Sequence, residues 1–210
     1  MKPLKIAIVG AGPAGLAASL LLTRAGHATD IIERFDSPAP VGSALMLQPT
    51  GLTVLEALGL GPAIHAAGNR IDRLFGTETA RGRIVLDVRY NALPGGRYGL
   101  GVHRAALFDT LYDEVSGRRH PIYTGQRVLG VVEEGDGSYL SIEGGERLGP
   151  YDLVIDASGA RSELVAASPV APRTRDLAYG AFWATLDCPD GLVDQAALTQ
   201  RYDKASVMIG

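Results

Sequence analysis

The chain has 210 residues, of which 46% are hydrophobic, so it can form a buried core and is not expected to be disordered. The formal net charge is −3, and the 20 basic and 23 acidic residues are spread along the sequence without a basic stripe, so we expect no nucleic-acid partner. No segment has the roughly 18 consecutive apolar residues that a membrane span requires.

The beginning of the chain predicts a strand, a helix and a second strand. Leu4 to Val9 is a short apolar run that ends in glycine, which is typical of a strand buried on both faces. Residues 13 to 25 predict a helix, because Pro13 suits the first turn, apolar residues recur at helical spacing and Gly26 ends the pattern. Ala28 to Ile32 is a second buried strand.

A glycine turn joins the first strand to the helix. With 27 glycines in the chain, a Gly-x-Gly-x-x-Gly match is weak evidence by itself. Here Gly10 makes a tight turn after a buried strand, Gly12 lets a pyrophosphate approach the backbone, and Gly15 lets the helix pack closely. Glu33, 18 residues after Gly15, can accept hydrogen bonds from ribose hydroxyls. The predicted residues of the turn are Gly10, Gly12, Pro13, Ala14 and Gly15. We predict dinucleotide binding, with a merely structural glycine turn as the alternative.

The Rossmann pattern stops after its second strand. A loop rich in proline and small residues (Ser37 to Gly42) precedes a predicted helix at about Gly51 to Leu58. Three β-prone stretches with glycine-containing turns follow, at Arg70 to Phe75, Arg83 to Val88 and Arg97 to Leu100. These predict antiparallel strands inserted at about residues 70–100.

The second half of the chain returns to parallel-sheet character and then changes again. A helix is predicted at His103 to Ser116, because Leu107, Leu111 and Val115 recur every four residues. The predicted strands are Ile122 to Tyr123, Arg127 to Glu133, Tyr139 to Glu143, Tyr151 to Asp156, Ala178 to Leu186, Ala197 to Tyr202 and Ala205 to Ile209. The last three follow Pro169 and predict the start of a different sheet.

Several stretches resemble the class A flavoprotein monooxygenases, the para-hydroxybenzoate hydroxylase family. They are Glu33-Arg34, the stretch Val41 to Pro49 with the following helix end Leu58-Gly59-Leu60, and Gly101 to Leu107, and the resemblance extends over nearly the whole chain. It implies an α/β fold with a Rossmann-like, GR2-type FAD-binding domain of three layers (ββα) in residues 1–168. Residues 169–210 would then begin a mixed or antiparallel substrate-binding sheet.

The resemblance also implies cofactor roles outside the glycine turn. Glu33 and Arg34 would reach the adenosine, the loop with Ser43 would run along the flavin side, Arg104 would contact the cofactor, and the backbone of Val128 would contact adenine. Because a cation in the first turn of a helix opposes the helix dipole, a bound anion would explain Arg104. The alternatives are a solvated surface charge at Arg34 and an exposed side chain at Arg104 that points away from the helix end.

A third stretch, Asp152 to Ser162, resembles the family's Asp-Gly motif but departs from it twice. Asp156 stands where the family has glycine, and Ser158 stands where the family has the aspartate implicated in FAD and NAD(P)H binding. Ala157 and Ser158 would still lie against FAD. The uncharged Ser158 favours, as an alternative activity, a flavin-dependent reductase or a halogenase-like oxidoreductase.

The implied activity is FAD-dependent hydroxylation of a small aromatic or polycyclic substrate with NAD(P)H and O₂, and the remaining alternative is a non-catalytic FAD-binding fragment. No catalytic residue is identified, and the four scattered histidines predict no metal site. A single cysteine, Cys188, and no signal-peptide pattern lead us to expect a cytoplasmic protein. Family members continue for about as long again, and the apolar run at Val207 to Gly210 looks like a strand cut before its partner. We therefore expect either a truncated, inactive N-terminal fragment or a homo-oligomer or second chain that completes the fold.

Overall fold

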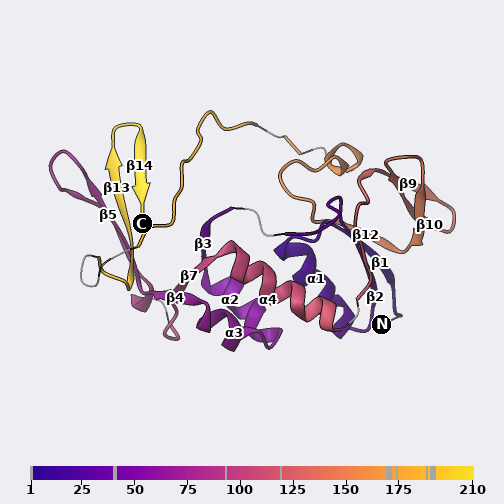
Figure 1. The fold of residues 1–210 in the computed structure, drawn as a ribbon, viewed down its shortest axis with the longest axis horizontal. Coiled ribbons are helices and arrows are strands. Elements are labelled where there is room, and N and C mark those ends of the chain that lie inside the picture. The colour runs from indigo at the N-terminus through magenta and orange to yellow at the C-terminus, as the bar shows by residue number, and fades with distance from the viewer. Residues whose placement is uncertain are drawn as a thin grey trace. The chain divides into compact units, whose positions relative to one another are not determined.

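The computed structural model describes residues 2–39, 42–92, 94–118, 120–168, 172–173, 175–187, 189 and 193–210. The chain divides into two compact units (Figure 1). The first comprises Met1–Val41 and Leu107–Phe182, and the second comprises Gly42–Ala106 and Trp183–Gly210. Each unit is described by itself below. The predicted division into FAD-binding residues 1–168 and substrate-binding residues 169–210 is a division by function and stays a prediction.

A parallel sheet is the centre of the first unit. Its strand order is β12-β1-β2-β8, and every pairing is parallel. The strands are β1 (Lys5–Val9), β2 (Ala28–Ile32), β8 (Ile122–Tyr123) and β12 (Leu153–Asp156). Helix α1 (Pro13–Arg24) connects β1 to β2, and Gly26 after it has a φ of +90°, the left-handed conformation that ends helices. The predicted strand, helix and strand at the beginning of the chain are confirmed.

An antiparallel sheet covers the face of the parallel sheet opposite α1 (Figure 1). It consists of β9 (Val128–Glu134), β10 (Gly137–Ile142) and β11 (Arg147–Tyr151), in the order β11-β10-β9. Ala7 and Val9 of β1 belong to one buried cluster with Leu140 of β10, whereas Ile8 points toward α1 at Gly15. Because successive side chains of β1 are buried on both faces, the strand reads as a continuous apolar run. The predicted three-layer arrangement is confirmed.

The predicted strand Tyr151 to Asp156 is two strands in the structure. Tyr151 ends β11, where it pairs with Ser138, and β12 begins at Leu153. Asp152 separates them: its backbone N–H donates to the Lys5 carbonyl, and its carboxylate accepts the Lys5 backbone N–H at 2.7 Å. The break follows from these contacts with β1, which the apolar run itself does not reveal.

The second unit contains two further sheets. The first has the order β3-β7-β4, with all neighbours antiparallel, and the second has the order β14-β13-β5-β6, in which only β13 and β5 are parallel. The strands are β3 (Ala44–Leu47), β4 (Gly68–Ile71), β5 (Arg73–Glu78), β6 (Ile84–Arg89), β7 (Gly99–His103), β13 (Ala197–Asp203) and β14 (Ser206–Ile209). Its helices are α2 (Pro49–Ala57) and α3 (Gly61–Ala66), and α4 (Arg104–Gly117) starts here and continues into the first unit. The expected mixed sheet is confirmed.

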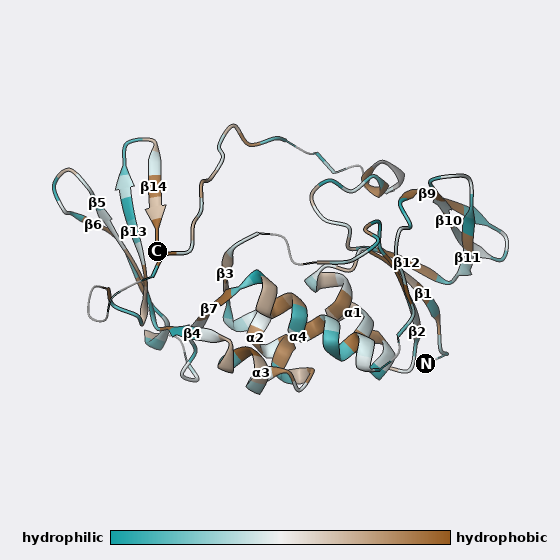
Figure 2. Ribbon diagram, in the orientation of Figure 1, coloured by the Kyte–Doolittle hydropathy of each residue, from teal (hydrophilic) through white to brown (hydrophobic). Residues whose placement is uncertain are grey.

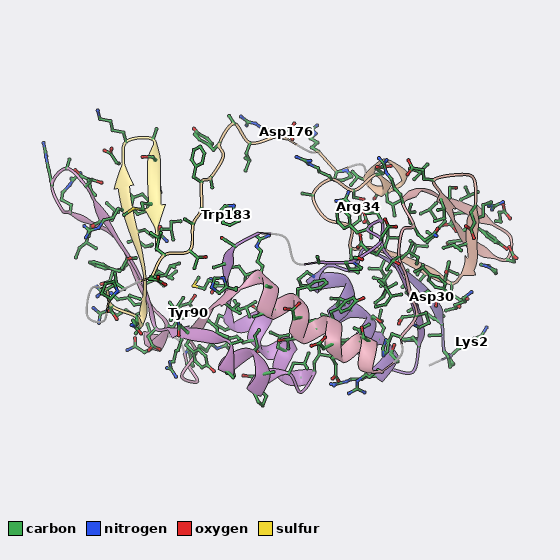
Figure 3. All side chains as sticks on the ribbon, in the orientation of Figure 1. Lys2, Asp30, Arg34, Tyr90, Asp176 and Trp183 are labelled. Atoms are coloured by element: carbon green, nitrogen blue, oxygen red, sulfur yellow. The ribbon has the colours of Figure 1, made fainter. Side chains whose placement is uncertain are left out.

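Sequence patterns also failed in four other places in the chain. The stretch Arg70 to Phe75 is broken at Asp72, so that β4 and β5 join different sheets, and the elements β3 and α3 were not predicted. The predicted strand Ala178 to Leu186 is irregular backbone with no partner strand among the described residues. Its Phe182 and Trp183 are exposed, not packed in a strand core (Figure 3). Cys188 lies outside the described residues.

Hydropathy follows these layers. The inner strands and the buried sides of the helices carry the hydrophobic residues, whereas β13 is largely hydrophilic next to the apolar end of β14 (Figure 2). In the described part of the chain, no helix is long and apolar enough to cross a membrane.

Candidate cofactor site

The glycine turn lies at the carboxyl ends of three parallel strands. The backbone N–H of Gly10 donates to the Ile32 carbonyl at 2.8 Å, and the N–H of Ala157 donates to the Val9 carbonyl at 2.8 Å. The turn after β1 and the turn after β12 are therefore fixed side by side. This is the edge where open parallel sheets bind their ligands.

The three glycines of the motif have different neighbours. A Cβ atom on Gly10, whose φ is +108°, would lie 2.6 Å from the Ala157 carbonyl oxygen. A Cβ on Gly15 would lie 2.0 Å from the Gly10 carbonyl oxygen. A Cβ on Gly12 would meet no atom within 4 Å. The backbone fold thus requires glycine at 10 and 15, whereas Gly12 borders open space of the kind that a ligand needs.

Helix α1 begins directly after this open position. Gly12 is its N-cap in an extended conformation, the first turn contains no acidic residue, and no side chain caps it. Pro13 has no N–H, so the first amide donors of the helix belong to Ala14 and Gly15. Such a helix start carries partial positive charge and can accommodate an anion.

Glu33 is buried, with 7% of its surface exposed, and it contacts the glycine turn directly. Its Oε2 accepts the backbone N–H of Ala11 at 2.7 Å, and its Oε1 accepts the backbone N–H of Phe35 at 3.0 Å. Each carboxylate oxygen keeps a second lone pair. Glu33 is therefore a fixed acceptor that also holds the turn in place, and the sequence motif predicted only its ligand-facing role.

An open pocket of ≈170 Å³ lies at this edge. It is lined by seven of the predicted residues, Gly10, Gly12, Glu33, Arg34, Val128, Ala157 and Ser158. The Arg34 side chain extends from the end of β2, and its guanidinium lies 4.8 Å from the centre of the Phe35 ring (Figure 3). The lining also includes Arg127 and Glu163, which belong to none of the sequence motifs. In the sequence, only their closeness to predicted residues indicates this: Arg127 precedes Val128, and Glu163 comes five residues after Ser158.

The motif departures at Asp156 and Ser158 form one hydrogen-bonded group. Asp156 Oδ1 accepts the backbone N–H of Ser158 at 3.0 Å and its hydroxyl at 2.6 Å, and Oδ2 accepts the hydroxyl of Ser162. Burial raises the pKa of the Asp156 carboxyl, but the hydrogen bonds from Ser158 and Ser162 outweigh burial and leave the pKa below its ordinary value. Because Ser158 gives its hydroxyl proton to Asp156, it presents an acceptor to the pocket.

Ser43 and Arg104 meet in the second unit. The backbone N–H of Arg104 donates to the Ser43 carbonyl at 2.8 Å, next to the β3–β7 pair Ala44 and His103. A Cβ on Gly42, whose φ is +103°, would lie 2.8 Å from the Arg104 Cδ. Gly42 therefore gives room to the Arg104 side chain, which is exposed at the start of α4. In the described residues, no group of three or more His, Cys, Asp or Glu side chains could hold a metal ion.

Comparison with known proteins decides the family. The family model described as FAD binding domain matches residues 3–190. This chain belongs to that family. The chain is 33% identical over 165 residues to 3-amino-4-hydroxybenzoate 2-monooxygenase of Streptomyces cremeus, covering 77% of this chain and 41% of the relative. It is 35% identical over 135 residues to 6-methylpretetramide 4-monooxygenase of Streptomyces rimosus, covering 62% of this chain and 31% of the relative. These FAD-binding domain relatives are monooxygenases, and the chain spans less than half of their length.

Solved structures show the same fold. A variant of Klebsiella pneumoniae HpxO complexed with FAD superimposes with a TM-score of 0.76 at 21% identity, covering 98% of this chain and 53% of that chain. The tetrameric 2-methyl-3-hydroxypyridine-5-carboxylic acid oxygenase superimposes with a TM-score of 0.66 at 22% identity, covering 78% of this chain and 42% of that chain. The FAD-binding, Rossmann-like fold expected from the sequence is confirmed.

Proposed function

We propose that the pocket at the ends of β1, β2 and β12 binds the adenosine and pyrophosphate of FAD, and that the protein hydroxylates a small aromatic or polycyclic substrate with NAD(P)H and O₂. The observation that carries the proposal is the paired arrangement of Gly12, which borders open space, and Glu33, whose buried carboxylate faces the same pocket. The monooxygenase names of the relatives support the reaction.

The residues of the pocket suit the parts of the cofactor. Glu33 would accept hydrogen bonds from the ribose hydroxyls, because one lone pair on each oxygen remains after the backbone contacts. Arg34 would lie along the adenosine, and the backbone of Val128 would contact adenine. The pyrophosphate would face the start of α1 at Gly10, Gly12, Pro13, Ala14 and Gly15, where an anion is favoured.

The remaining assigned residues concern other parts of FAD. Ala157 and Ser158 would border the cofactor, with Ser158 offering an acceptor to a hydroxyl group. We assign Ser43 and Arg104 to the flavin side of FAD. FAD, when bound, supplies the redox chemistry of the reaction, and the protein binds and orients it.

Direct measurement of cofactor uptake tests this proposal. The purified chain is incubated with FAD, separated from free FAD by gel filtration and examined for flavin absorbance. We expect yellow protein whose flavin is bleached by NADPH without oxygen, and a hydroxylated aromatic product when oxygen is admitted. Colourless protein that takes up no FAD would overturn the proposal.

A flavin-dependent reductase or halogenase-like oxidoreductase is the second candidate, because Ser158 stands where the monooxygenase motif carries aspartate and the nearby Asp156 carboxylate is engaged by Ser158 and Ser162. A product that contains halogen, or substrate reduction without oxygen incorporation, would favour it. Bound FAD that NADPH does not bleach would favour a non-catalytic FAD-binding chain.

We also propose that a second copy or a second polypeptide pairs with β14, as part of a cytoplasmic protein. β14 is the outermost strand of its sheet, and Val207, Met208 and Ile209 are 48%, 70% and 59% exposed. An apolar outer strand favours pairing with another strand. The single cysteine of the sequence supports the cytoplasmic location. Light scattering of the chain and of Met208→Lys tests the pairing: a dimer that the substitution dissociates supports a second copy, and a monomer favours a different partner.

A further inference from the structure

Arg127 joins three segments of the first unit at the rim of the cofactor pocket. It precedes β9, and its Nε and Nη2 both donate to Oε1 of Glu163, at 3.0 and 2.6 Å. Its Nη1 donates to Oε1 of Glu143 at 3.1 Å. Glu163 follows the turn after β12, and Glu143 follows β10. One guanidinium thus connects the beginning of β9 to both of these segments.

The backbone around Arg127 is also fixed from two sides. The Arg127 carbonyl accepts the backbone N–H of Glu143 at 2.9 Å, and the N–H of Gln126 donates to the Glu33 carbonyl at 2.9 Å. Gln126, Arg127 and Val128 all line the pocket. The segment 126–128 is therefore a wall of the pocket that is attached to Glu33 on one side and to Glu143 and Glu163 on the other.

These ion pairs are too exposed to contribute much to folding. The side chains of Arg127 and Glu163 are 49% and 40% exposed, and pairs of this kind contribute about 0–1 kcal/mol to stability. The hydrogen bonds to Glu163 are the main cause of the raised pKa of Arg127, so the guanidinium stays charged. Because two carboxylates already neutralise it, Arg127 is a poor phosphate ligand but a good connector between segments.

We propose that Arg127 is a positioning residue for the adenosine half of FAD: through Glu163 and Glu143 it holds the 126–128 wall against the bound adenosine and slows release of the cofactor. This inference rests on the proposed binding of FAD in the same pocket. It assigns to Arg127 a role that no motif of the chain indicates, and it predicts that adenosine-containing ligands alone depend on it.

The test compares Arg127→Gln with Arg147→Gln. Arg147 is a matched control, because it forms an exposed ion pair with Glu134 at 2.6 Å and lies over the Tyr139 ring, yet it does not line the pocket. Release of FAD is followed by flavin fluorescence in stopped flow, and dissociation constants are measured for FAD, ADP and FMN. Thermal unfolding of the cofactor-free proteins reports on folding.

We expect Arg127→Gln to release FAD about fivefold to tenfold faster and to raise the dissociation constant of ADP by the same factor. The dissociation constant of FMN should not change. Arg147→Gln should bind and release all three ligands as the unsubstituted chain does. Glu163→Gln should reproduce part of the effect, and the exchange Arg127→Glu with Glu163→Arg should restore part of the affinity. If Arg127→Gln does not fold, Glu163→Gln carries the test.

Two results would overturn the inference. One is equal FAD release in the Arg127→Gln and Arg147→Gln proteins, and the other is equal weakening of ADP and FMN. A chain without substitutions that binds neither FAD nor ADP would instead overturn the proposed function itself, together with this inference.

Discussion

Oε2 of Glu33 accepts the backbone N–H of Ala11, inside the glycine turn, at 2.7 Å. The sequence motif predicts only that Glu33 contacts the ribose of a bound ligand. The carboxylate at the end of β2 and the turn after β1 therefore form one unit. Loss of the carboxylate should affect both the fold without cofactor and the binding of FAD.

Replacement of Glu33 by alanine leaves the N–H groups of Ala11 and Phe35 without their acceptor. The hydrogen bond from Ala11 is buried, and a buried donor that loses its partner costs about 1–3 kcal/mol, so we expect the free energy of unfolding in urea to fall by at least about 1 kcal/mol. Glu134→Ala, at an exposed ion pair, should change it by less than about 0.5 kcal/mol. Equal stability of the two variants would contradict a structural role for Glu33.

The glycines of the turn should separate folding from binding. Gly12→Ala adds a Cβ to open space, so we expect the free energy of unfolding of the cofactor-free protein to change by less than about 1 kcal/mol. The same substitution should lower the affinity for FAD at least about tenfold, because the Cβ would occupy space that the pyrophosphate needs. Gly15→Ala places a Cβ 2.0 Å from the Gly10 carbonyl oxygen, and we expect it to prevent folding. Circular dichroism and FAD titration measure both properties. A Gly12→Ala protein with full FAD affinity would argue against pyrophosphate at this position.

Because of Asp156, the free energy of unfolding should depend on pH in the acid range. Its pKa in the folded protein lies below the ordinary value of 3.8, so its contribution is complete above about pH 4 and is lost as the pH falls through the lowered pKa. Asp156→Asn should remove that part of the pH dependence. Urea unfolding of both proteins from about pH 6 to about pH 2 provides the measurement. Parallel curves for the two proteins would show that Ser158 and Ser162 do not stabilise the carboxylate.

Arg104 should contribute to FAD affinity through the flavin side of the cofactor, and Gly42 should leave room for the Arg104 side chain. We expect Arg104→Gln to weaken FAD about tenfold and to leave ADP less affected, because the proposed contact lies beyond the adenosine. Gly42→Ala, whose Cβ would lie 2.8 Å from Arg104 Cδ, should weaken FAD in the same direction. Arg83→Gln, which removes an exposed ion pair with Glu78, serves as the control in isothermal titration. An equal loss of affinity for ADP and for FAD would contradict this assignment.

Part of the site could be predicted because its residues lie close together in the chain. The strand before Gly10, the helix after Gly12 and the strand before Glu33 depend on apolar periodicity and turn chemistry within a few residues of each position. The same holds for α4, whose buried Leu107, Leu111 and Val115 were predicted. The sequence by itself therefore determined the dinucleotide-binding unit and its likeness to flavoproteins.

The tertiary structure decided which distant segments meet. Arg127 and Glu163 are 36 residues apart, β5 pairs with β13 across more than a hundred residues, and Asp72 ends β4 because its backbone N–H donates to Ala196. Glu33 binds the Ala11 N–H because β1 and β2 pair in parallel register. Hydrogen bonds and ion pairs of this kind depend on positions in space, and local periodicity carries no information about them.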